Sequence, residues 1–390
     1  MKRALISLII CILLTGCWSS KELGESAFVA AVAIEKEGDL YTPKLQFLQP
    51  VKLEQGATDA HIMIASEGLS AHQSLRSAIK GVHRRIYLSH AQTFVVSTEI
   101  AKEGIFPALD IIYRDQMFRL TSYLFIADQP GTLLALPSPV DPLTGISLAN
   151  GIEAAEDSHQ RVITTTLKEF MEMSYEPGGC AYVIRLKKHA DENQKEPHID
   201  LDGTAILKEG IYVKDINDIL ADALRYYRNE AGNDTFTMQV PDGDDWFALE
   251  RLQARTSIHT RLQNNELIID VSVNTDANIN EWHSSTELDG LMFKKIGKAY
   301  SEELQARMEK LLAKMREEPV TDILGFGTEV RRQLPTYWKQ VQDNWDTAFK
   351  TAKVNITVET NIENFNLIEN TNREPNQGPP KRFQLPWIKN

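Results

Sequence analysis

The chain has 390 residues, of which 42% are hydrophobic and 25% are charged, and this composition is typical of globular proteins with a sizeable buried core. Its formal net charge of −12 argues against a nucleic-acid-binding protein, which usually carries a basic patch or a high pI. The chain has only three cysteines, which excludes a small secreted module held together by disulfides.

The N-terminus has the pattern of a secretory signal peptide. Lys2 and Arg3 form a short positive region, and residues 4–14 form an apolar run that only Ser7 interrupts. A transmembrane helix needs about 20 apolar residues, so this run is too short to span a membrane. It has the length of a signal-peptide core. No later run of apolar residues is long enough to span a membrane either.

The next four residues match a lipobox, Leu14-Thr15-Gly16-Cys17. We therefore expect residues 1–16 to be removed and Cys17 to become the mature N-terminus. Its thiol is expected to carry a diacylglyceryl group, with N-acylation as a further expected modification. Two or more acyl chains anchor a protein stably, so the body is predicted to lie on the extracytoplasmic face of a membrane.

The first half of the mature chain predicts alternating strands and short helices. Residues 27–34 and 41–48 are expected to form a hairpin, and Ser70 is expected to cap a helix. Glycine and proline residues predict two short helices within 99–114, broken at Gly104 and Pro107. The other elements expected here are strands at 92–97, 121–127 and 180–186, an irregular proline-rich crossing at 130–142, and a helix at 166–173.

The second half predicts longer elements after a polar stretch at 187–197, which is the expected domain boundary. A helix is expected to begin at Asp215 and to end near residue 228. The alternation of apolar and polar residues in 267–280 predicts a strand with one buried face. The other elements expected here are a hairpin of 199–207 and 211–213, a partner strand at 246–262, helices at 291–316 and after Pro335, and a strand at 354–362.

These elements predict an α+β fold with several domains, in which helices pack on mixed, largely antiparallel sheets. Residues 17–190 are expected to form an N-terminal α+β domain, and residues 198–370 a C-terminal α+β domain that could divide into two subdomains. Residues 371–390 form a proline-rich tail with four basic residues and one acidic residue, a net charge of +3. Docking on the acidic body, or disorder, is the simplest interpretation of this composition. Because aromatic residues accompany the basic ones, a sharper hypothesis is that the tail touches the membrane or a membrane subunit.

The sequence carries no recognisable catalytic or metal-binding motif. His61, His72 and His83 are spaced by 11 residues, but Gly68 interrupts the helix that this spacing would require. Ser77 and Lys80 match S-x-x-K, but the other motifs of that enzyme class are missing. Cys180 has no motif around it and is predicted to be structural. We therefore expect a protein that is not an enzyme and has no metal and no cofactor apart from the lipid on Cys17.

Several stretches of the chain resemble the Ger(x)C lipoproteins, the C subunits of nutrient germinant receptors in spores of Bacillus and its relatives. The strongest resemblance is Asp322-Ile323-Leu324-Gly325-Phe326-Gly327, followed by Pro335, Trp338 and Trp345. The other stretches are Gly16-Cys17-Trp18 with Lys21-Glu22-Leu23, residues 85–92, residues 99–104, and Gly203-Thr204-Ala205-Ile206-Leu207-Lys208. Leu207 stands where the family commonly has phenylalanine, which keeps the position apolar.

The resemblance implies a lipid-anchored protein on the outer face of the spore inner membrane. It implies partners, the integral-membrane A and B subunits of the receptor, and a response to nutrients that triggers germination. It also implies a three-domain α+β fold without catalytic residues. A solute-binding lipoprotein of a transporter and a lipid-anchored hydrolase are the alternative interpretations of the sequence.

The residues around Phe326 are candidates for structural or partner-contact roles. Gly325 and Gly327 are expected to permit a chain reversal between two helices, because glycine tolerates positive φ. Phe326 is expected to bury its ring between those helices. The same candidate group includes Pro335, Trp338 and Trp345. One face of a single helix after Pro335 is expected to carry an apolar stripe toward the protein core: Trp338, Val341, Trp345 and Phe349.

Overall fold

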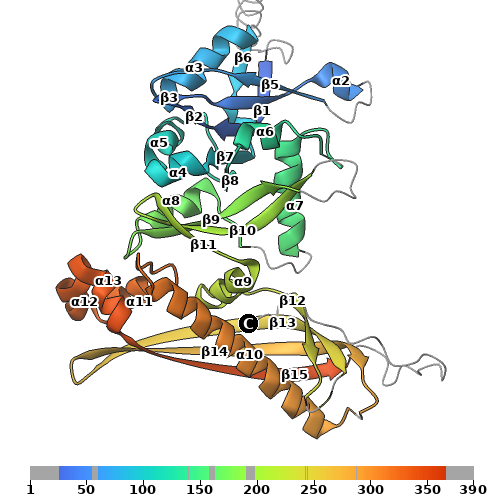
Figure 1. Cartoon of the computed structure of the whole chain (residues 1–390), viewed down its shortest axis with the longest axis vertical. Coiled ribbons are helices and arrows are strands. Elements are labelled where there is room, and N and C mark those ends of the chain that lie inside the picture. Colours follow the sequence, from blue (N-terminus) through green and yellow to red (C-terminus); the bar gives the residue numbers. More distant parts are fainter. Residues whose placement is uncertain are drawn as a thin grey trace, which may run out of the picture.

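A computed structural model describes residues 26–54, 60–138, 140–157, 163–189, 198–241, 243, 245–286 and 288–365. The expected signal peptide, Cys17 and the tail at 371–390 lie outside these residues. The described chain forms an elongated molecule with a large mixed sheet toward one end and a second, smaller sheet at the other (Figure 1). No helix of the described part is both long and apolar enough to cross a membrane.

The large sheet has nine strands, and its central strands are parallel. The strand order is β11-β10-β9-β8-β7-β1-β4-β5, with β6 paired to β1. Pairing is parallel from β9 through β8 and β7 to β1, and antiparallel at both sides. The strands are β1 (Ser26–Ile34), β4 (Lys44–Leu48), β5 (His61–Ala65), β6 (Arg85–Tyr87), β7 (Thr93–Ser97), β8 (Tyr123–Ala127), β9 (Cys180–Lys188), β10 (Ile199–Lys208) and β11 (Ile211–Ile216). The short pair β2 (Lys36–Glu37) and β3 (Leu40–Tyr41) forms the tip of the expected first hairpin.

Helices cover both faces of this sheet, because its central strands are apolar on both sides. Phe94 and Val96 of β7 belong to one buried cluster, together with residues of α3, α4, α5, α8 and α9. Val95 of the same strand belongs to the other cluster, with α6 and α7. The helices are α2 (Pro50–Glu54), α3 (Ala71–Val82), α4 (Thr98–Glu103), α5 (Phe106–Arg114), α6 (Pro130–Leu134), α7 (Thr144–Asp157), α8 (Leu167–Ser174) and α9 (Asp218–Tyr227), with a 3-10 turn η2 (Leu88–His90).

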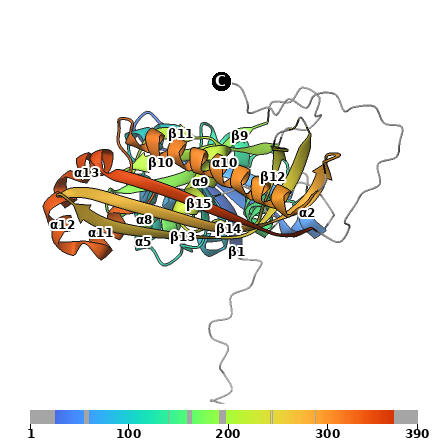
Figure 2. The ribbon, with the colours of Figure 1, turned by 90° about the horizontal axis from the view of Figure 1, so that it is seen from below.

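The second sheet has the order β12-β13-β14-β15 and is crossed by one long helix. The expected long hairpin is present as β13 (Trp246–Gln263) and β14 (Glu266–His283), with β12 (Asp234–Gln239) at one edge and β15 (Lys353–Phe365) at the other. Helix α10 (Gly290–Arg316) lies along these strands, as Figure 2 shows from below. The expected apolar stripe of α10 is confirmed, since all its members are buried: Met292, Ile296, Tyr300, Leu304, Met308, Leu311 and Met315.

Short helices at one end of the second sheet complete the fold. They are α11 (Phe326–Gln333), α12 (Pro335–Val341), the 3-10 turn η3 (Gln342–Asn344) and α13 (Trp345–Thr351). The prediction of one continuous helix after Pro335 is wrong, because α12 ends at Val341. Asn344 stands at the N-cap position of α13, where its side chain accepts a hydrogen bond from the Thr347 hydroxyl (2.8 Å) and makes no capping bond to a backbone N–H. Helix α11 was not predicted from the sequence.

Three other expectations need correction. Asp215 does not open a helix but lies in β11, and Asn217 caps α9 by accepting from the Leu220 amide (3.1 Å). Pro107 does not break a helix. It lies in the first turn of α5, where its missing N–H costs nothing. The expected irregular crossing at 130–142 contains α6, which begins at Pro130.

The large sheet continues across the expected domain boundary. Strands β9 and β10 flank residues 190–197 and pair with each other from Lys188 opposite Ile199 to Cys180 opposite Lys208. The sequence regions 17–190 and 198–370 therefore share one sheet. The second sheet begins only at Asp234, after α9.

Candidate functional site

The segment between α10 and α11 forms the junction between the two sheets, and lysines of the β10–β11 hairpin hold it. The Lys208 ammonium donates to the carbonyl of Val320 (2.8 Å) and pairs with Asp346 at the start of α13. The Lys214 ammonium donates to the carbonyl of Glu317 (2.9 Å), just after α10 ends. The large sheet is thereby fixed to the helices that connect β14 to β15.

Asp322 is the centre of this junction. Its carboxylate is buried and accepts three N–H groups: the amide of Phe326 (3.2 Å), the amide of Gly327 (2.7 Å) and the indole Nε1 of Trp345 (2.9 Å). Burial raises the pKa of the Asp322 carboxyl, and the three hydrogen bonds act in the opposite direction. One side chain thus organises the first turn of α11 and fixes the position of α13.

The two glycines at this position have different roles. Gly325 has φ +83 and begins α11 from the left-handed region, as the sequence predicts. Gly327 lies inside α11 instead of in a reversal. A Cβ at Gly327 would approach Pro177 to 2.7 Å and the Trp345 indole to 3.0 Å, so glycine is needed here for close packing.

The candidate aromatic residues come together as buried side chains. Phe326 is fully buried, with its ring centroid 5.6 Å from Tyr227 and 6.0 Å from Phe349. The indoles of Trp338 and Trp345 are also buried, with centroids 5.3 Å apart. These positions place the aromatic group in the core, while Pro335 is exposed and starts α12.

A cavity of about 500 Å³ opens beside the junction. Arg228 connects the cavity to the junction. Its guanidinium makes a bidentate ion pair with Glu176 of the cavity lining (2.9 and 3.2 Å). The same guanidinium packs against Gly325 of the junction, where an added Cβ would lie only 2.8 Å from it. Burial raises the pKa of Glu230 in the lining. The lining residues are Ile163, Thr164, Glu169, Glu172, Met173, Glu176, Tyr182, Arg225, Arg228 and Glu230. Four glutamates and two arginines make this lining strongly charged, and part of that charge is neutralised within it by the Arg228–Glu176 pair.

The residues weighed for catalysis or metal binding lie apart from this cavity. The Ser77 hydroxyl donates to the Gln73 carbonyl (3.0 Å) within α3. Cys180 is buried, and burial raises the pKa of its thiol to about 12, which makes it a poor nucleophile. His61 lies in β5, His72 lies in α3, and His83 follows α3.

Sequence reasoning missed two buried groups of the junction region. One is Asp322, whose place four residues before the start of α11 was the only available signal. The other is the Asp222–Arg251 pair, which connects α9 to β13 and is fully buried. The alternation of residues in β13 places Arg251 on the apolar face of the strand. A charged residue at an apolar position is the signal that could have identified this buried pair.

We expect Asp322→Asn to lower the free energy of unfolding by about 1–3 kcal/mol, because an amide has one acceptor oxygen where the carboxylate has two, which leaves a buried N–H unsatisfied. Chemical denaturation of the purified protein measures this change. Asp343→Asn is the matched control, because Asp343 is exposed in η3. Equal stability of the two variants would show that the three N–H groups do not depend on the Asp322 carboxylate.

Comparison with known proteins shows similarity along both halves of the chain. The family model "Spore germination protein N-terminal domain" matches residues 19–188, and "Spore germination B3/ GerAC like, C-terminal" matches residues 202–366. Spore germination protein KC of Bacillus subtilis (strain 168) is 23% identical over 94% of this chain and 96% of its own length. Spore germination protein A3 of the same organism is 22% identical over 94% of this chain and 98% of its own length.

A solved structure shares the fold. The crystal structure of the GerBC protein matches with a TM-score of 0.54 at 16% sequence identity, covering 85% of this chain and 96% of that one. The mixed α+β architecture with packed helices is therefore a known arrangement.

Proposed function

Because the chain belongs to the Ger(x)C family of spore germination proteins, we propose that it is the lipid-anchored C subunit of a spore nutrient germinant receptor. The observation that carries this proposal is the match along nearly the whole chain, in both halves, to relatives named as spore germination proteins. The subunit acts without catalysis, in a complex with the integral-membrane A and B subunits. This family membership favours the receptor role over the solute-binding and hydrolase alternatives.

The structure supports a scaffolding role for this subunit. The junction around Asp322 is buried and cross-linked by ion pairs, so the two sheets hold a fixed arrangement that partner subunits could recognise. The stretch that most resembles the family, residues 322–327, is the same stretch that builds this junction. The resemblance therefore falls on residues that set the shape of the protein.

The proposed role is tested by deleting the gene in spores. Because several relatives occur in one organism, the deletion should be made in spores that lack the other family members. We expect these spores to lose nutrient-triggered germination, measured as the fall in optical density, and to regain it with a wild-type copy. An unchanged nutrient response would contradict a receptor role.

Cys17→Ala should release the protein from the membrane fraction, because the diacylglyceryl anchor is attached to this thiol. Fractionation of cells that lack the A and B subunits measures the anchor alone. Cys180→Ala is the matched control, because that cysteine is buried and free. Retention of the Cys17→Ala variant in those membranes would refute the lipid anchor.

Deleting residues 371–390 should weaken binding to anionic vesicles. Each basic residue near an anionic surface contributes about 1 kcal/mol, so a net charge of +3 corresponds to roughly 3 kcal/mol, or about a hundredfold in affinity. Vesicle sedimentation of the Cys17→Ala protein at low salt, with and without the tail, measures this difference, and neutral vesicles are the control. Equal binding to anionic vesicles would contradict a tail that contacts the membrane.

A further inference from the structure

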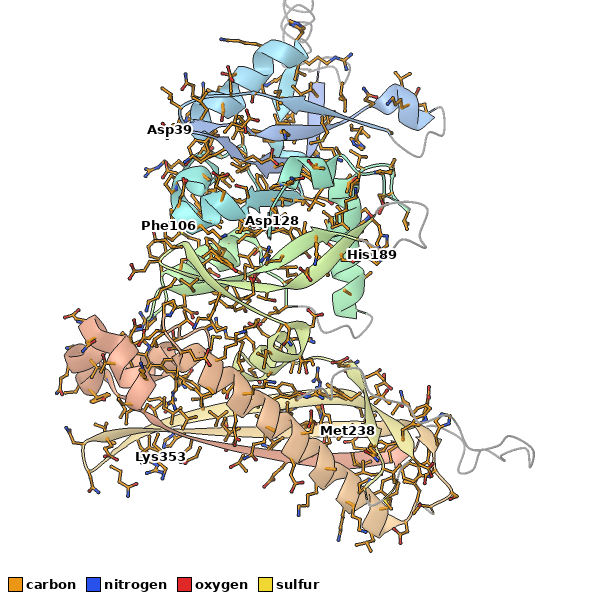
Figure 3. The ribbon with its side chains drawn as sticks, viewed as in Figure 1. Asp39, Phe106, Asp128, His189, Met238 and Lys353 are labelled. Atoms are coloured by element: carbon orange, nitrogen blue, oxygen red, sulfur yellow. The ribbon has the colours of Figure 1, made fainter. Side chains whose placement is uncertain are left out.

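Two histidines and an aspartate meet where β9 and β10 pair, far along the chain from the junction at Asp322. His189 directly follows β9, His198 directly precedes β10, and Asp200 lies in β10. The His189 amide donates to the His198 carbonyl (2.8 Å), which places the two residues opposite each other. Asp200 is two residues after His198, so both side chains leave the strand on the same face. Figure 3 shows His189 at the end of β9, well away from Lys353 of the second sheet.

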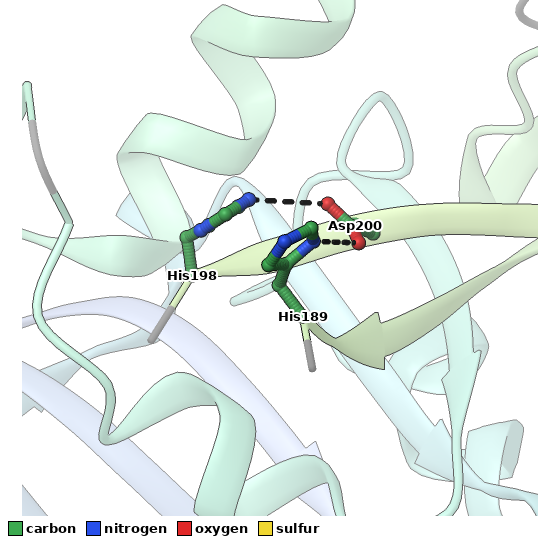
Figure 4. A group of neighbouring side chains, drawn as sticks. All are labelled: His189, His198 and Asp200. Carbon is green, nitrogen blue, oxygen red and sulfur yellow. Dashed lines mark hydrogen bonds and ion pairs between the residues drawn. The ribbon is translucent and has the colours of Figure 1, made fainter. Parts of the chain in front are cut away.

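The three side chains converge on one point. His189 Nδ1 lies 2.6 Å from Asp200 Oδ2, and His198 Nε2 lies 3.4 Å from Asp200 Oδ1. The two imidazole rings stack with centroids 4.0 Å apart. Figure 4 shows that each imidazole reaches a different oxygen of the same carboxylate. One carboxylate is therefore shared by two imidazoles that are in contact with each other.

This donor set is suited to a metal ion. Two imidazole nitrogens and one carboxylate oxygen are ligands that Zn²⁺ and other first-row divalent metals take, with solvent in the remaining position. One ligand atom from each residue lies within 4.8 Å of the other two. Ligands about 2.0–2.2 Å from a tetrahedral zinc ion are roughly 3.4 Å apart, so side-chain rotations that shorten these separations would bring all three onto one ion.

The surroundings leave the carboxylate available and the site accessible. Lys187 lies opposite Asp200 in the strand register, but its ammonium pairs with a different carboxylate, that of Asp202, at 3.8 Å. The exposed fractions of the three side chains are 26% for His189, 29% for His198 and 44% for Asp200, so an ion could enter from solvent. Among the residues that the structure describes, this is the one group of three or more histidine, cysteine or acidic side chains with metal-ligand spacing.

We propose that His189, His198 and Asp200 form a binding site for a divalent first-row transition metal ion, with Zn²⁺ as the best-suited ion. A bound ion would fasten the end of β9 to the start of β10. The sequence alone did not indicate this site, because the spacing of His61, His72 and His83 gave no ligand set and the polar residues 187–197 resemble a domain boundary. The site is independent of the proposed receptor role, since the ion would act on the strand pair itself.

The test is calorimetric titration of the full-length protein with ZnCl₂. The protein should be purified in detergent without a polyhistidine tag and stripped of metal with a chelator. We expect saturable binding of one ion and an increase in the thermal midpoint, because a ligand that binds only the folded state stabilises it. His198→Ala and Asp200→Asn should each weaken binding by at least the roughly 10–100-fold that is typical of losing a group that only supports a ligand.

His283→Ala is the matched control. His283 also faces a carboxylate, Glu281 (3.3 Å), but no third ligand joins this pair among the residues that the structure describes, so this variant should bind Zn²⁺ like the wild type. Circular dichroism of each metal-free variant separates loss of a ligand from loss of the fold. The proposal is overturned if the wild type shows no saturable binding, or if folded His198→Ala and Asp200→Asn proteins bind as tightly as the wild type.

Discussion

Phe326→Ala should lower the free energy of unfolding by about 3–5 kcal/mol, the range for removing a fully buried aromatic ring from a core. The ring fills the space between Tyr227 of α9 and Phe349 of α13, which belong to different parts of the junction. Its removal would leave a cavity at the point where the two sheets are joined. Chemical denaturation of the purified protein measures the loss.

A matched control separates burial from hydrophobicity. Leu291 is also a large apolar residue, but it is 62% exposed at the start of α10. Leu291→Ala should therefore change the free energy of unfolding by no more than about 0.5 kcal/mol. Equal stability of the two variants would contradict a core role for Phe326 and would make it a candidate for contact with a partner subunit.

Arg251→Met should cost a similar amount, about 3–5 kcal/mol, because it removes the nearer of the two guanidinium groups that face the buried Asp222 and leaves only Arg225, 4.0 Å away. The Arg251 guanidinium is fully buried, lies 3.7 Å from Asp222, and donates to the Gly232 carbonyl (2.5 Å) and the Tyr226 hydroxyl. The Tyr226 hydroxyl in turn lies 3.0 Å from that of Tyr300 in α10. The network connects α9, α10 and the second sheet.

Two further variants identify the cause of this loss. Asp222→Asn combined with Arg251→Met should restore part of the stability, because the buried charge is then removed with its partner. Arg255→Met is the control, since Arg255 is exposed on the same strand. If Arg251→Met were no more destabilising than Arg255→Met, the buried ion pair would contribute nothing to the joint between the sheets.

Regular periodicity was sufficient to predict the long elements of this fold. The apolar stripe of α10 and the alternation of β14 were visible in the sequence because each element is long and buries one face along its length, so the apolar residues repeat many times. The ends of short helices were harder to predict from the sequence, because capping residues determine where such helices begin and end. The side chain of Asn217, for example, caps α9, whereas the sequence predicted that this helix begins at Asp215.

The candidate site could be predicted only in part. Phe326, Trp338 and Trp345 were identifiable as apolar residues near one another in sequence, and all three are buried. The role of Asp322 depends on three N–H groups, one of them from a residue 23 positions away, and no local pattern shows that contact. The continuity of the large sheet across residues 190–197 was hidden for a similar reason, because a polar connection between strands resembles a linker between domains.

The receptor role is tested most directly by purifying the lipidated protein from spore membranes in mild detergent and identifying the proteins that accompany it. We expect an integral-membrane A subunit and a membrane B subunit in stable amounts, and their loss when Phe326→Ala or Arg251→Met disrupts the junction. Recovery of the wild-type protein without those subunits, or with the components of a transporter, would contradict the receptor role.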